Sequence, residues 1–302
     1  MFDSTLAKRL SEIESADVYF DEPMKNHTSF RTGGNAKLFV IPKNDGEIKE
    51  ILSLCEAEKV PYFVLGNGSN ILVPDDGIGD RVVIYLGENL AYIELLDETT
   101  LLVGAGTKLI QLCRFALKNS LAGLEFAYGI PGSVGGAAYM NAGAYGGEMK
   151  DVLIKANHLN SDGTEGFFAG EELDLSYRHS AYSGKDMIIT SVVLKLKKGN
   201  MEEIDAAMKD FLGRRKDKQP LEYPSAGSVF KRPEGYFAGA LIEQSGLKGK
   251  RVGGAMVSEK HAGFIINYDN ATTTDILNLI DFCRETVKEK FGVTLEAEIR
   301  TV

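Results

Sequence analysis

The alternation of apolar and polar residues predicts that the first third of the chain interleaves helices with buried strands. Apolar residues recur at helical spacing over residues 45–58. The short segments "PYFVL" at residues 61–65 and "RVVIYL" at residues 81–86 are mainly apolar, which is typical of strands covered on both faces. We therefore expect a helix followed by two buried strands in this region.

The middle of the chain is richer in strands. One helix, expected over residues 107–118, interrupts them, and the tetrapeptide "SDGT" has the composition of a hairpin turn. The candidate strands lie in the segments "AYIELLD", "TLLVGAG", "VLIKANHLNSDGTEGFF" and "DMIITSVVLKLKK".

The last third is set apart by a proline-rich segment. A helix is expected over residues 202–215, and three prolines then fall within fourteen residues, from Pro220 to Pro233. Proline at this density breaks regular structure, so we place a domain boundary near residues 200–220. Beyond it we expect an α+β region: a helix in "YFAGALIEQSG", a strand in "AGFIINY", a helix over residues 274–290 and a closing strand in "VTLEAEIRTV".

Residues 129–148, "GIPGSVGGAAYMNAGAYGGE", combine seven glycines in twenty residues with large apolar side chains. A glycine-rich run can be a flexible linker. A solvated linker has no use for Ile130, Val134 and Tyr139, however. We expect an ordered segment whose glycines bring the backbone close to a ligand while the apolar side chains anchor it in the core.

A second glycine-rich segment, "LGNGSNILV" at residues 65–73, connects two predicted strands. Its successive N–H groups can converge on an anion. It is not a Rossmann fingerprint, because Ile71 stands at the third glycine position and a strand follows. A plain hairpin loop remains the alternative. Taken together, the two segments favour a dinucleotide pyrophosphate held by backbone amides.

Charge and length restrict the function further. The 302 residues carry a formal net charge of -9, whereas non-specific nucleic-acid binding needs a basic surface. No apolar run approaches the roughly 20 residues of a membrane span, and the first residues lack the pattern of a signal peptide. We expect a cytoplasmic protein without nucleic-acid or membrane partners, and no obligate protein partner is evident.

Cysteine and histidine give no indication of a metal site. Cys55, Cys113 and Cys283 each fall on the apolar face of a predicted helix, which is typical of buried thiols. The four histidines show no metal-ligand spacing. We therefore expect no metal.

Six motifs follow one another along the chain: "NHTSFRTGG", "LGNGSNILV", "GIPGSVGGAAYMNAGAYGGE", "SYRHSAY", "PSAGSVFKRP" and "LEAEIR". In these motifs and their order, the chain resembles the UDP-N-acetylenolpyruvoylglucosamine reductase (MurB) family, in its shorter, type II form. The resemblance implies an α+β fold, with a two-lobed FAD-binding domain of the vanillyl-alcohol-oxidase (PCMH) type at residues 1–88 and 89–205 and a C-terminal α+β substrate-binding domain at residues 206–302. It also implies non-covalent FAD and reduction of the enolpyruvyl group of a UDP-sugar by NADPH, which gives UDP-N-acetylmuramate for peptidoglycan.

Three catalytic residues follow from the resemblance. Ser228 of "SAGSVFK" matches the family's proton donor, and Arg178 of "LSYRHSAY" matches the arginine that faces the substrate carboxylate. The third is a carboxylate near the C-terminus. Alternation places both Glu296 and Glu298 on the polar face of the predicted strand and cannot choose between them. The family match, a carboxylate directly before isoleucine or valine, favours Glu298.

The resemblance also implies binding residues. Lys231 is a candidate contact to the substrate's phosphates, and Tyr177, which we expect mainly to pack, is a second candidate substrate contact. The candidates for FAD are Arg31, Gly66, Asn67, Gly68, Ser69, Asn70, Gly132, Ser133, Gly135, Gly136, Ala137, Asn141, Gly143 and Gly146.

Two alternatives and one open question remain. The short interval between Arg178 and Ser228 has no room for the segment whose tyrosine covers the substrate in the longer family type, so the covering of the UDP moiety stays open. Another FAD-dependent oxidase or dehydrogenase of the same fold is one alternative, although such relatives often tether flavin through a histidine or cysteine, and none lies in residues 65–73. A non-catalytic nucleotide-binding module is the other.

Overall fold

The computed structural model describes residues 4–302, which form two compact units, each with its own apolar core. Unit 1 comprises Met1–Phe20 (described from residue 4), Leu38–Asn67 and Asp80–Arg214, and unit 2 comprises Asp21–Lys37, Gly68–Gly79 and Arg215–Val302. Both units are therefore built from separate stretches of the chain. The division into lobes at residues 88 and 89 stays a prediction, because most of both expected lobes lies in unit 1.

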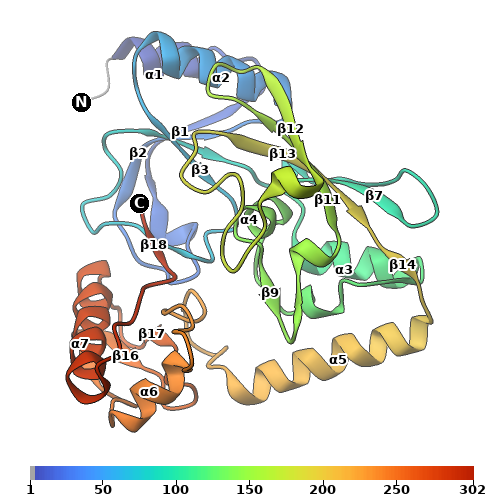
Figure 1. Cartoon of the computed structure of the whole chain (residues 1–302). Coiled ribbons are helices and arrows are strands. Elements are labelled where there is room, and N and C mark those ends of the chain that lie inside the picture. Colours follow the sequence, from blue (N-terminus) through green and yellow to red (C-terminus); the bar gives the residue numbers. More distant parts are fainter. Residues whose placement is uncertain (1–3) are drawn as a thin grey trace. The chain divides into compact units, whose positions relative to one another are not determined.

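The first sheet of unit 1 follows the helix and strands predicted for the first third. Its spatial order is β1 (Asp17–Pro23), β2 (Asn35–Ile41), β5 (Val82–Tyr85) and β3 (Tyr62–Leu65), with β2 and β3 both parallel to β5. The helix α2 (Asp45–Ala57) begins at Asn44, whose side chain accepts a hydrogen bond from the amide of Glu47 and so caps the first turn. Figure 1 shows α1 (Ser4–Ser11) lying beside α2.

The second sheet of unit 1 is antiparallel and confirms the strands predicted for the middle of the chain. The predicted "SDGT" turn joins β11 (Leu153–Leu159) to β12 (Glu165–Ala169), with Gly163 at a left-handed φ of 79°. A two-residue pair, β8 (Leu121–Ala122) with β14 (Lys197–Lys198), lies outside this sheet. The strands of the second sheet, in spatial order, are β12 (Glu165–Ala169), β11 (Leu153–Leu159), β13 (Ile188–Lys195), β7 (Thr100–Gly104) and β6 (Ile93–Leu95).

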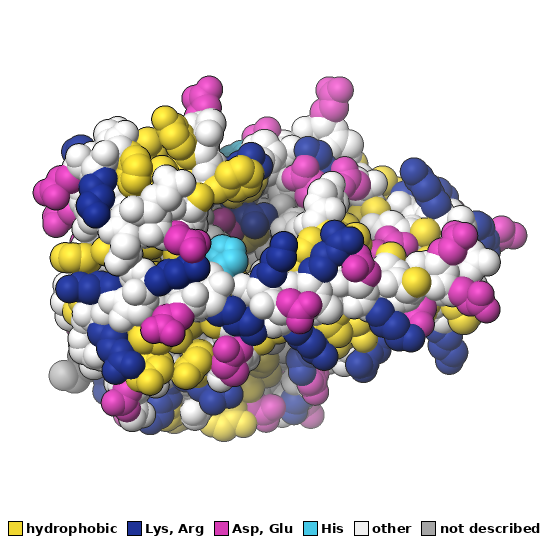
Figure 2. Space-filling view, turned by 90° about the horizontal axis from the view of Figure 1, so that it is seen from below, with side chains coloured by type: hydrophobic (Ala, Val, Ile, Leu, Met, Phe, Trp, Pro, Cys, Tyr) yellow, Lys and Arg dark blue, Asp and Glu magenta, His cyan; other side chains and the backbone are white. Residues whose placement is uncertain are grey.

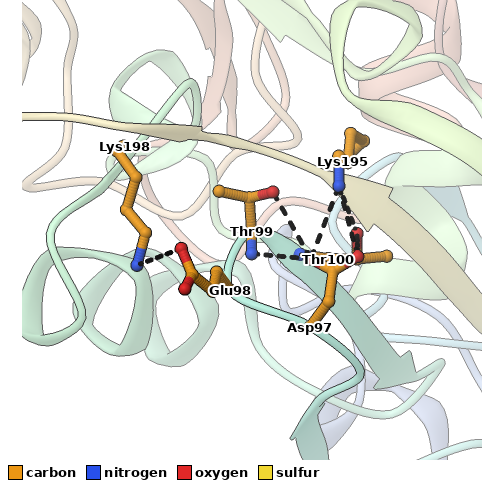
Figure 3. Close-up of polar contacts among 6 residues, drawn as sticks. All are labelled: Asp97, Glu98, Thr99, Thr100, Lys195 and Lys198. Atoms are coloured by element: carbon orange, nitrogen blue, oxygen red, sulfur yellow. Dashed lines mark hydrogen bonds and ion pairs between the residues drawn. The ribbon is translucent and has the colours of Figure 1, made fainter.

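A single carboxylate organises the turn between β6 and β7 (Figure 3). The Asp97 carboxylate accepts hydrogen bonds from the amides of Thr99 and Thr100, both at 2.8 Å, and from the Thr100 hydroxyl at 2.7 Å. Lys195, opposite Thr100 on β13, lies 3.3 Å from the same carboxylate. The Thr99 amide and then the Thr100 hydroxyl hold the pKa of Asp97 well below its usual range.

The remaining elements of unit 1 lie around this sheet. The helix α3 (Leu109–Lys118) matches the helix expected there, and a short helix, α4 (Val134–Tyr139), contacts β13 and β7. The glycine-rich segment therefore folds into a helix followed by a small hairpin of β9 (Gly143–Ala144) and β10 (Gly147–Glu148), neither of which the sequence pattern predicts. The 3-10 turns of unit 1 are η2 (Glu88–Leu90), η3 (Glu125–Ala127), η4 (Met149–Asp151) and η5 (Gly170–Leu173), whereas η1 (Met24–Asn26) belongs to unit 2.

The long helix α5 (Met201–Lys218) runs from the end of unit 1 into unit 2 (Figure 1). On the apolar face of this helix, Ile204 and Met208 are buried. Phe211 of this face stacks instead on Tyr145 at the tip of the β9–β10 hairpin, with ring centroids 4.9 Å apart and an interplanar angle of 1°.

Unit 2 packs helices against a small antiparallel sheet. The sheet has the order β15 (Arg251–Val252), β16 (Ala255–Val257) and β17 (Ile265–Asn267), and it contacts the helix α7 (Thr273–Phe291). The helix α6 (Ala238–Gln244) packs on α7 (Thr273–Phe291), which Thr272 caps at its start and Gly292 ends in a left-handed conformation.

The predicted closing strand is wrong over most of its length. Only β18 (Arg300–Thr301) is a strand, paired in parallel with β4 (Ile71–Leu72). Residues 293–299 make one isolated bridge, between Ala297 and Phe230. The apolar alternation is real, because Leu295 and Ile299 are buried, but it reflects packing on the core of unit 2 and not a continuous ladder of hydrogen bonds.

The cysteines are buried as predicted, and none forms a disulfide. Burial raises the pKa of Cys55 to about 11 and those of Cys113 and Cys283 to about 12, so the thiols stay protonated at neutral pH. Within residues 4–302, no group of three or more His, Cys, Asp or Glu side chains is placed to hold a metal ion.

Two further observations concern the surface and the helices. Figure 2 shows lysine and arginine side chains interspersed with aspartate and glutamate on the face drawn, without a large region of one sign. None of the helices in the described part of the chain is both long enough and apolar enough to cross a membrane.

Candidate active site

The two glycine-rich segments contact each other in unit 1. Such a contact is required if both segments hold one pyrophosphate. The Asn67 side-chain amide donates to the carbonyl of Pro131 at 2.6 Å. A Cβ on Gly66 would lie 2.5 Å from Oγ of Ser133, so a side chain at this position would displace that hydroxyl. The backbone at Gly66 can therefore approach a bound group without a side chain in the way, which fits the close backbone contact expected for a pyrophosphate.

Gly68, in unit 2, is required by a different neighbour. Its φ is 59°, and a Cβ there would lie 1.9 Å from the carbonyl oxygen of His27. The Gly68 carbonyl in turn accepts a hydrogen bond from the amide of Ser29 at 3.0 Å. The loop at residues 66–70 thus rests on the "NHTSF" motif, where Arg31 also holds a left-handed φ of 56°.

The end of this loop is tied to the C-terminal segment of unit 2. The side-chain amide of Asn70 donates to the carbonyl of Glu298 at 3.3 Å, and the Asn70 carbonyl accepts from the amide of Arg300 at 3.1 Å. Sequence reasoning assigned Asn70 to the cofactor alone and missed this second contact. The parallel pairing of β4 with β18, which produces it, has no signal in the sequence.

The start of α4 divides the glycine-rich candidates into two groups. The Ser133 hydroxyl caps the helix by accepting from the Gly136 amide at 3.4 Å. Gly135 serves packing: its amide donates to the carbonyl of Ala105 at 2.9 Å, and a Cβ would lie 2.8 Å from the Ala105 side chain. Ala137 is likewise buried in the core. Gly136 is exposed and Gly132 is half-buried, and the amide of Gly132 donates to the carbonyl of Ile130 at 2.9 Å.

The later candidates of this stretch form the hairpin and its supports. A Cβ on Gly143 would lie 2.8 Å from the Glu148 side chain, whereas Gly146, at a φ of 87°, has open space around it. Asn141 is buried and has its amide bonded within the protein. These positions were assigned to FAD from their glycine-rich context, and that assignment stays a prediction.

Arg178 lies in a tight two-residue turn of unit 1. The amide of Ser176 donates to the carbonyl of His179 at 3.2 Å, and the amide of His179 donates back to the carbonyl of Ser176 at 3.1 Å. Arg178 takes a left-handed φ of 56°, the sign that a type II turn requires at its third position. Tyr177, which is 53% exposed, lies beside the guanidinium at 5.2 Å from ring centroid to Cζ.

Ser228 and Glu298 lie on neighbouring segments of unit 2. The amide of Glu298 donates to the carbonyl of Val229 at 2.7 Å, and Ser228 itself bridges to Phe264. The Ser228 hydroxyl donates to the carbonyl of Phe230 at 3.3 Å. The sequence does not predict that the segment holding Ser228 pairs with the segment holding Glu298.

The structure separates the two candidate glutamates. Glu296 has a side chain 73% exposed and forms an ion pair with Lys231 at 2.5 Å. Glu298 is half-buried on the segment next to Ser228. This difference supports Glu298 as the catalytic carboxylate, and it places Lys231, the candidate phosphate contact, beside an acidic partner.

The geometry and the comparisons with known proteins define the class. Residues 36–165 match the FAD binding domain family, and residues 219–302 match the family described as UDP-N-acetylenolpyruvoylglucosamine reductase, C-terminal domain. The structure of Phl p 4.0202, a glucose dehydrogenase, aligns with 66% of this chain and 45% of its own at a TM-score of 0.51; at 16% identity this shows the fold alone. The chain is an FAD-dependent oxidoreductase of mixed α and β structure.

Closer relatives give the family. The UDP-N-acetylenolpyruvoylglucosamine reductase of Syntrophomonas wolfei subsp. wolfei is 50% identical over 94% of this chain and 95% of its own length. The crystal structure of the reductase from Thermus caldophilus has a TM-score of 0.79 at 39% identity, over 95% of this chain and 98% of its own. The chain belongs to the UDP-N-acetylenolpyruvoylglucosamine reductase family. The resemblance, fold class and FAD cofactor predicted from the sequence are confirmed.

Proposed function

We propose that this chain reduces the enolpyruvyl group of UDP-N-acetylenolpyruvoylglucosamine with NADPH and forms UDP-N-acetylmuramate for peptidoglycan synthesis. The observation that carries the proposal is the pairing, in unit 2, of the segment holding Ser228 with the segment holding Glu298. The near-full-length identity with named reductases supports it.

FAD, when bound, supplies the hydride chemistry. The backbone of Gly66, Gly68, Gly132 and Gly136 would lie against FAD, since a side chain at Gly66 or Gly68 would meet neighbouring atoms and Gly136 is exposed. Arg31, Ser69 and Asn70 add hydrogen-bond donors from the same loop and from the motif beneath it.

Ser228 gives the proton. The double bond of the substrate is conjugated to a carboxylate, so hydride adds at the far carbon and the carbon next to the carboxylate must accept a proton. A serine hydroxyl is a weak acid, but the electron-rich carbon formed here is a much stronger base. The hydroxyl donates a long hydrogen bond, 3.3 Å, to the carbonyl of Phe230, and breaking this bond costs little free energy.

Arg178 and Glu298 act at the substrate carboxylate. The planar guanidinium matches a carboxylate whose negative charge grows during the reaction, and it therefore stabilises the transition state more than the ground state. Glu298 assists by a hydrogen bond at the same group. Tyr177 and Lys231 contact the remainder of the substrate.

Separated half-reactions test the proposal. The purified protein should be yellow with FAD, and NADPH should reduce the flavin in both the parent and Ser228→Ala. Only the parent should then form UDP-N-acetylmuramate when the enolpyruvyl sugar nucleotide is added. Ser225→Ala, in the same loop, is the matched control and should form product normally.

The alternatives give different results in the same experiment. A colourless protein that cannot be reconstituted with FAD would indicate a nucleotide-binding module without redox chemistry. Reduction of the oxidised flavin by an alcohol, without product from the enolpyruvyl sugar, would indicate an oxidase or dehydrogenase of the same fold. The proposal places the enzyme in the cytoplasm with a UDP-sugar and NADPH as its partners, and it needs no nucleic acid, membrane or second protein.

A further inference from the structure

The segment that carries Arg178 is fastened to the end of α4 within unit 1. The Ser180 hydroxyl donates to the carbonyl of Tyr139, the last residue of α4, at 2.7 Å. The amide of Gly184 donates to the hydroxyl of the same tyrosine at 3.2 Å. The glycine-rich segment therefore supports the arginine-bearing loop through Tyr139.

A third connection runs through Asn141, two residues beyond α4. Its side chain is 1% exposed and bonds three ways: Oδ1 accepts from the amide of Lys150 at 2.9 Å, and Nδ2 donates to a Glu148 carboxylate oxygen at 2.7 Å and to the carbonyl of Ser176 at 2.9 Å. An N–H donor on one side and two oxygen acceptors on the other fix the orientation of the amide. Both hydrogens of Nδ2 are used inside the protein.

The carbonyl of Ser176 is the first group of the turn that holds Arg178. It already accepts the turn-closing bond from the amide of His179, so the bond from Asn141 occupies its second acceptor position. Arg178 itself has a left-handed φ of 56°, a strained conformation for a residue with a side chain, which persists only where the surroundings impose it. Asn141 contributes to that restraint from outside the turn.

We propose that Asn141 is a positioning residue that holds the Arg178 turn through the carbonyl of Ser176. Asparagine suits the place in two respects: its amide both donates and accepts, and it tolerates the left-handed φ of 41° found here. Aspartate would lose both donors and bring a second negative charge to Glu148. This inference rests on the proposed function for the role of Arg178, and it replaces a direct contact of Asn141 with FAD.

Asn141→Gly is the informative variant, because glycine keeps the left-handed backbone without strain and removes only the side chain. We expect at least a tenfold loss in the rate of product formation from the reduced enzyme, with flavin content and the rate of flavin reduction by NADPH within twofold of the parent. The matched control is Asn119→Gly, directly after the end of α3, where the side chain also donates to a carbonyl, that of Phe115, and product formation should be unchanged.

A double-mutant cycle separates positioning from a general structural effect. In an Arg178→Ala background, Asn141→Gly should change the rate of product formation less than twofold, because the residue through which it acts is gone. An equal loss in both backgrounds would overturn the proposal. Loss of flavin from Asn141→Gly would also overturn it, in favour of direct cofactor binding.

A readout independent of catalysis completes the test. In Asn141→Gly, hydrogen exchange at the amide of His179, which closes the turn, should be at least tenfold faster than in the parent. Unchanged protection would refute the connection even if activity fell. If the parent chain proves inactive with the enolpyruvyl sugar, the proposed function fails, and the exchange experiment alone decides whether Asn141 holds the turn.

Discussion

Substitution of Gly68 by alanine tests the glycine loop most severely. The backbone there has a φ of 59°, and the added Cβ would lie 1.9 Å from the carbonyl oxygen of His27 and 3.1 Å from Cα of Thr28. Both neighbours are backbone atoms, so no side-chain rotation can relieve the contact. Either the loop or the "NHTSF" motif must move.

The magnitude follows from two separable costs. A left-handed alanine costs roughly 1–2 kcal/mol relative to glycine, and forcing an extra methyl into packed surroundings costs about 1–3 kcal/mol more. Gly68→Ala should therefore lower the free energy of unfolding by about 2–5 kcal/mol. Gly170→Ala is the matched control, because Gly170 has nearly the same φ, 55°, with nothing within 4 Å of the added Cβ. It should show only the first cost.

Urea denaturation of both variants and the parent, with FAD removed, measures the difference directly. Flavin occupancy of the same preparations, from the ratio of visible to ultraviolet absorbance, should fall in Gly68→Ala and stay at the parent level in Gly170→Ala. Unfolding free energies of the two variants within about 0.5 kcal/mol of each other, below the ~1 kcal/mol minimum of the packing cost, would refute the contact between the loop and His27.

Three further predictions address other parts of the chain. Glu298→Gln should lower product formation at least tenfold while Glu296→Gln leaves it within threefold, as measured with pre-reduced enzyme; the reverse order would assign the catalytic carboxylate to Glu296. For Asp97, whose pKa is lowered by folding, the stabilisation is complete above the unfolded pKa of about 3.9 and is lost as the pH falls toward the folded value. The difference in unfolding free energy between the parent and Asp97→Asn should therefore shrink between pH 6 and about pH 3, and a difference that grows on acidification would contradict this. A double-mutant cycle on Tyr145 and Phe211 should give a coupling of about 1 kcal/mol by urea unfolding; zero coupling would mean that the rings do not stack in solution.

Elements with strong periodicity and local capping could be predicted from the sequence. The helix over residues 45–58 combines a regular apolar face with Asn44 at its start, and α2 forms there. The "SDGT" turn supplies the glycine that a left-handed position needs, and β11 pairs with β12 around it. In these cases local chemistry and tertiary packing favour the same structure.

Elements that depend on contacts with distant parts of the chain could not be predicted from the sequence. The six residues of α4, "VGGAAY", have poor helix propensity, and the helix forms because Ser133 caps it and because Gly135 permits close contact with Ala105. The closing segment has a strand's alternation but pairs with its neighbours over only a few residues, so the predicted strand is confirmed only at β18.

The candidate site shows the same limit. A glycine in the sequence indicates that the backbone lies close to another group, but it does not identify that group. Gly66 lies against Ser133, whereas Gly135 lies against Ala105. The left-handed conformation of Arg178 has no sequence signal, because it occurs in a residue that ordinarily avoids it. The role inferred for Asn141 became visible only through its contact with Ser176, on a segment far along the chain.

Product formation by the parent and by Ser228→Ala tests the central claim most directly. With FAD, NADPH and the enolpyruvyl sugar nucleotide, the parent should consume one NADPH for each UDP-N-acetylmuramate formed, as followed by absorbance and mass spectrometry. Ser228→Ala should be reduced by NADPH at the parent's rate and then form no product on addition of the sugar nucleotide. Product formation by Ser228→Ala at the parent's rate would contradict the assignment of the proton donor, and NADPH oxidation by the parent without product would contradict the proposed reaction.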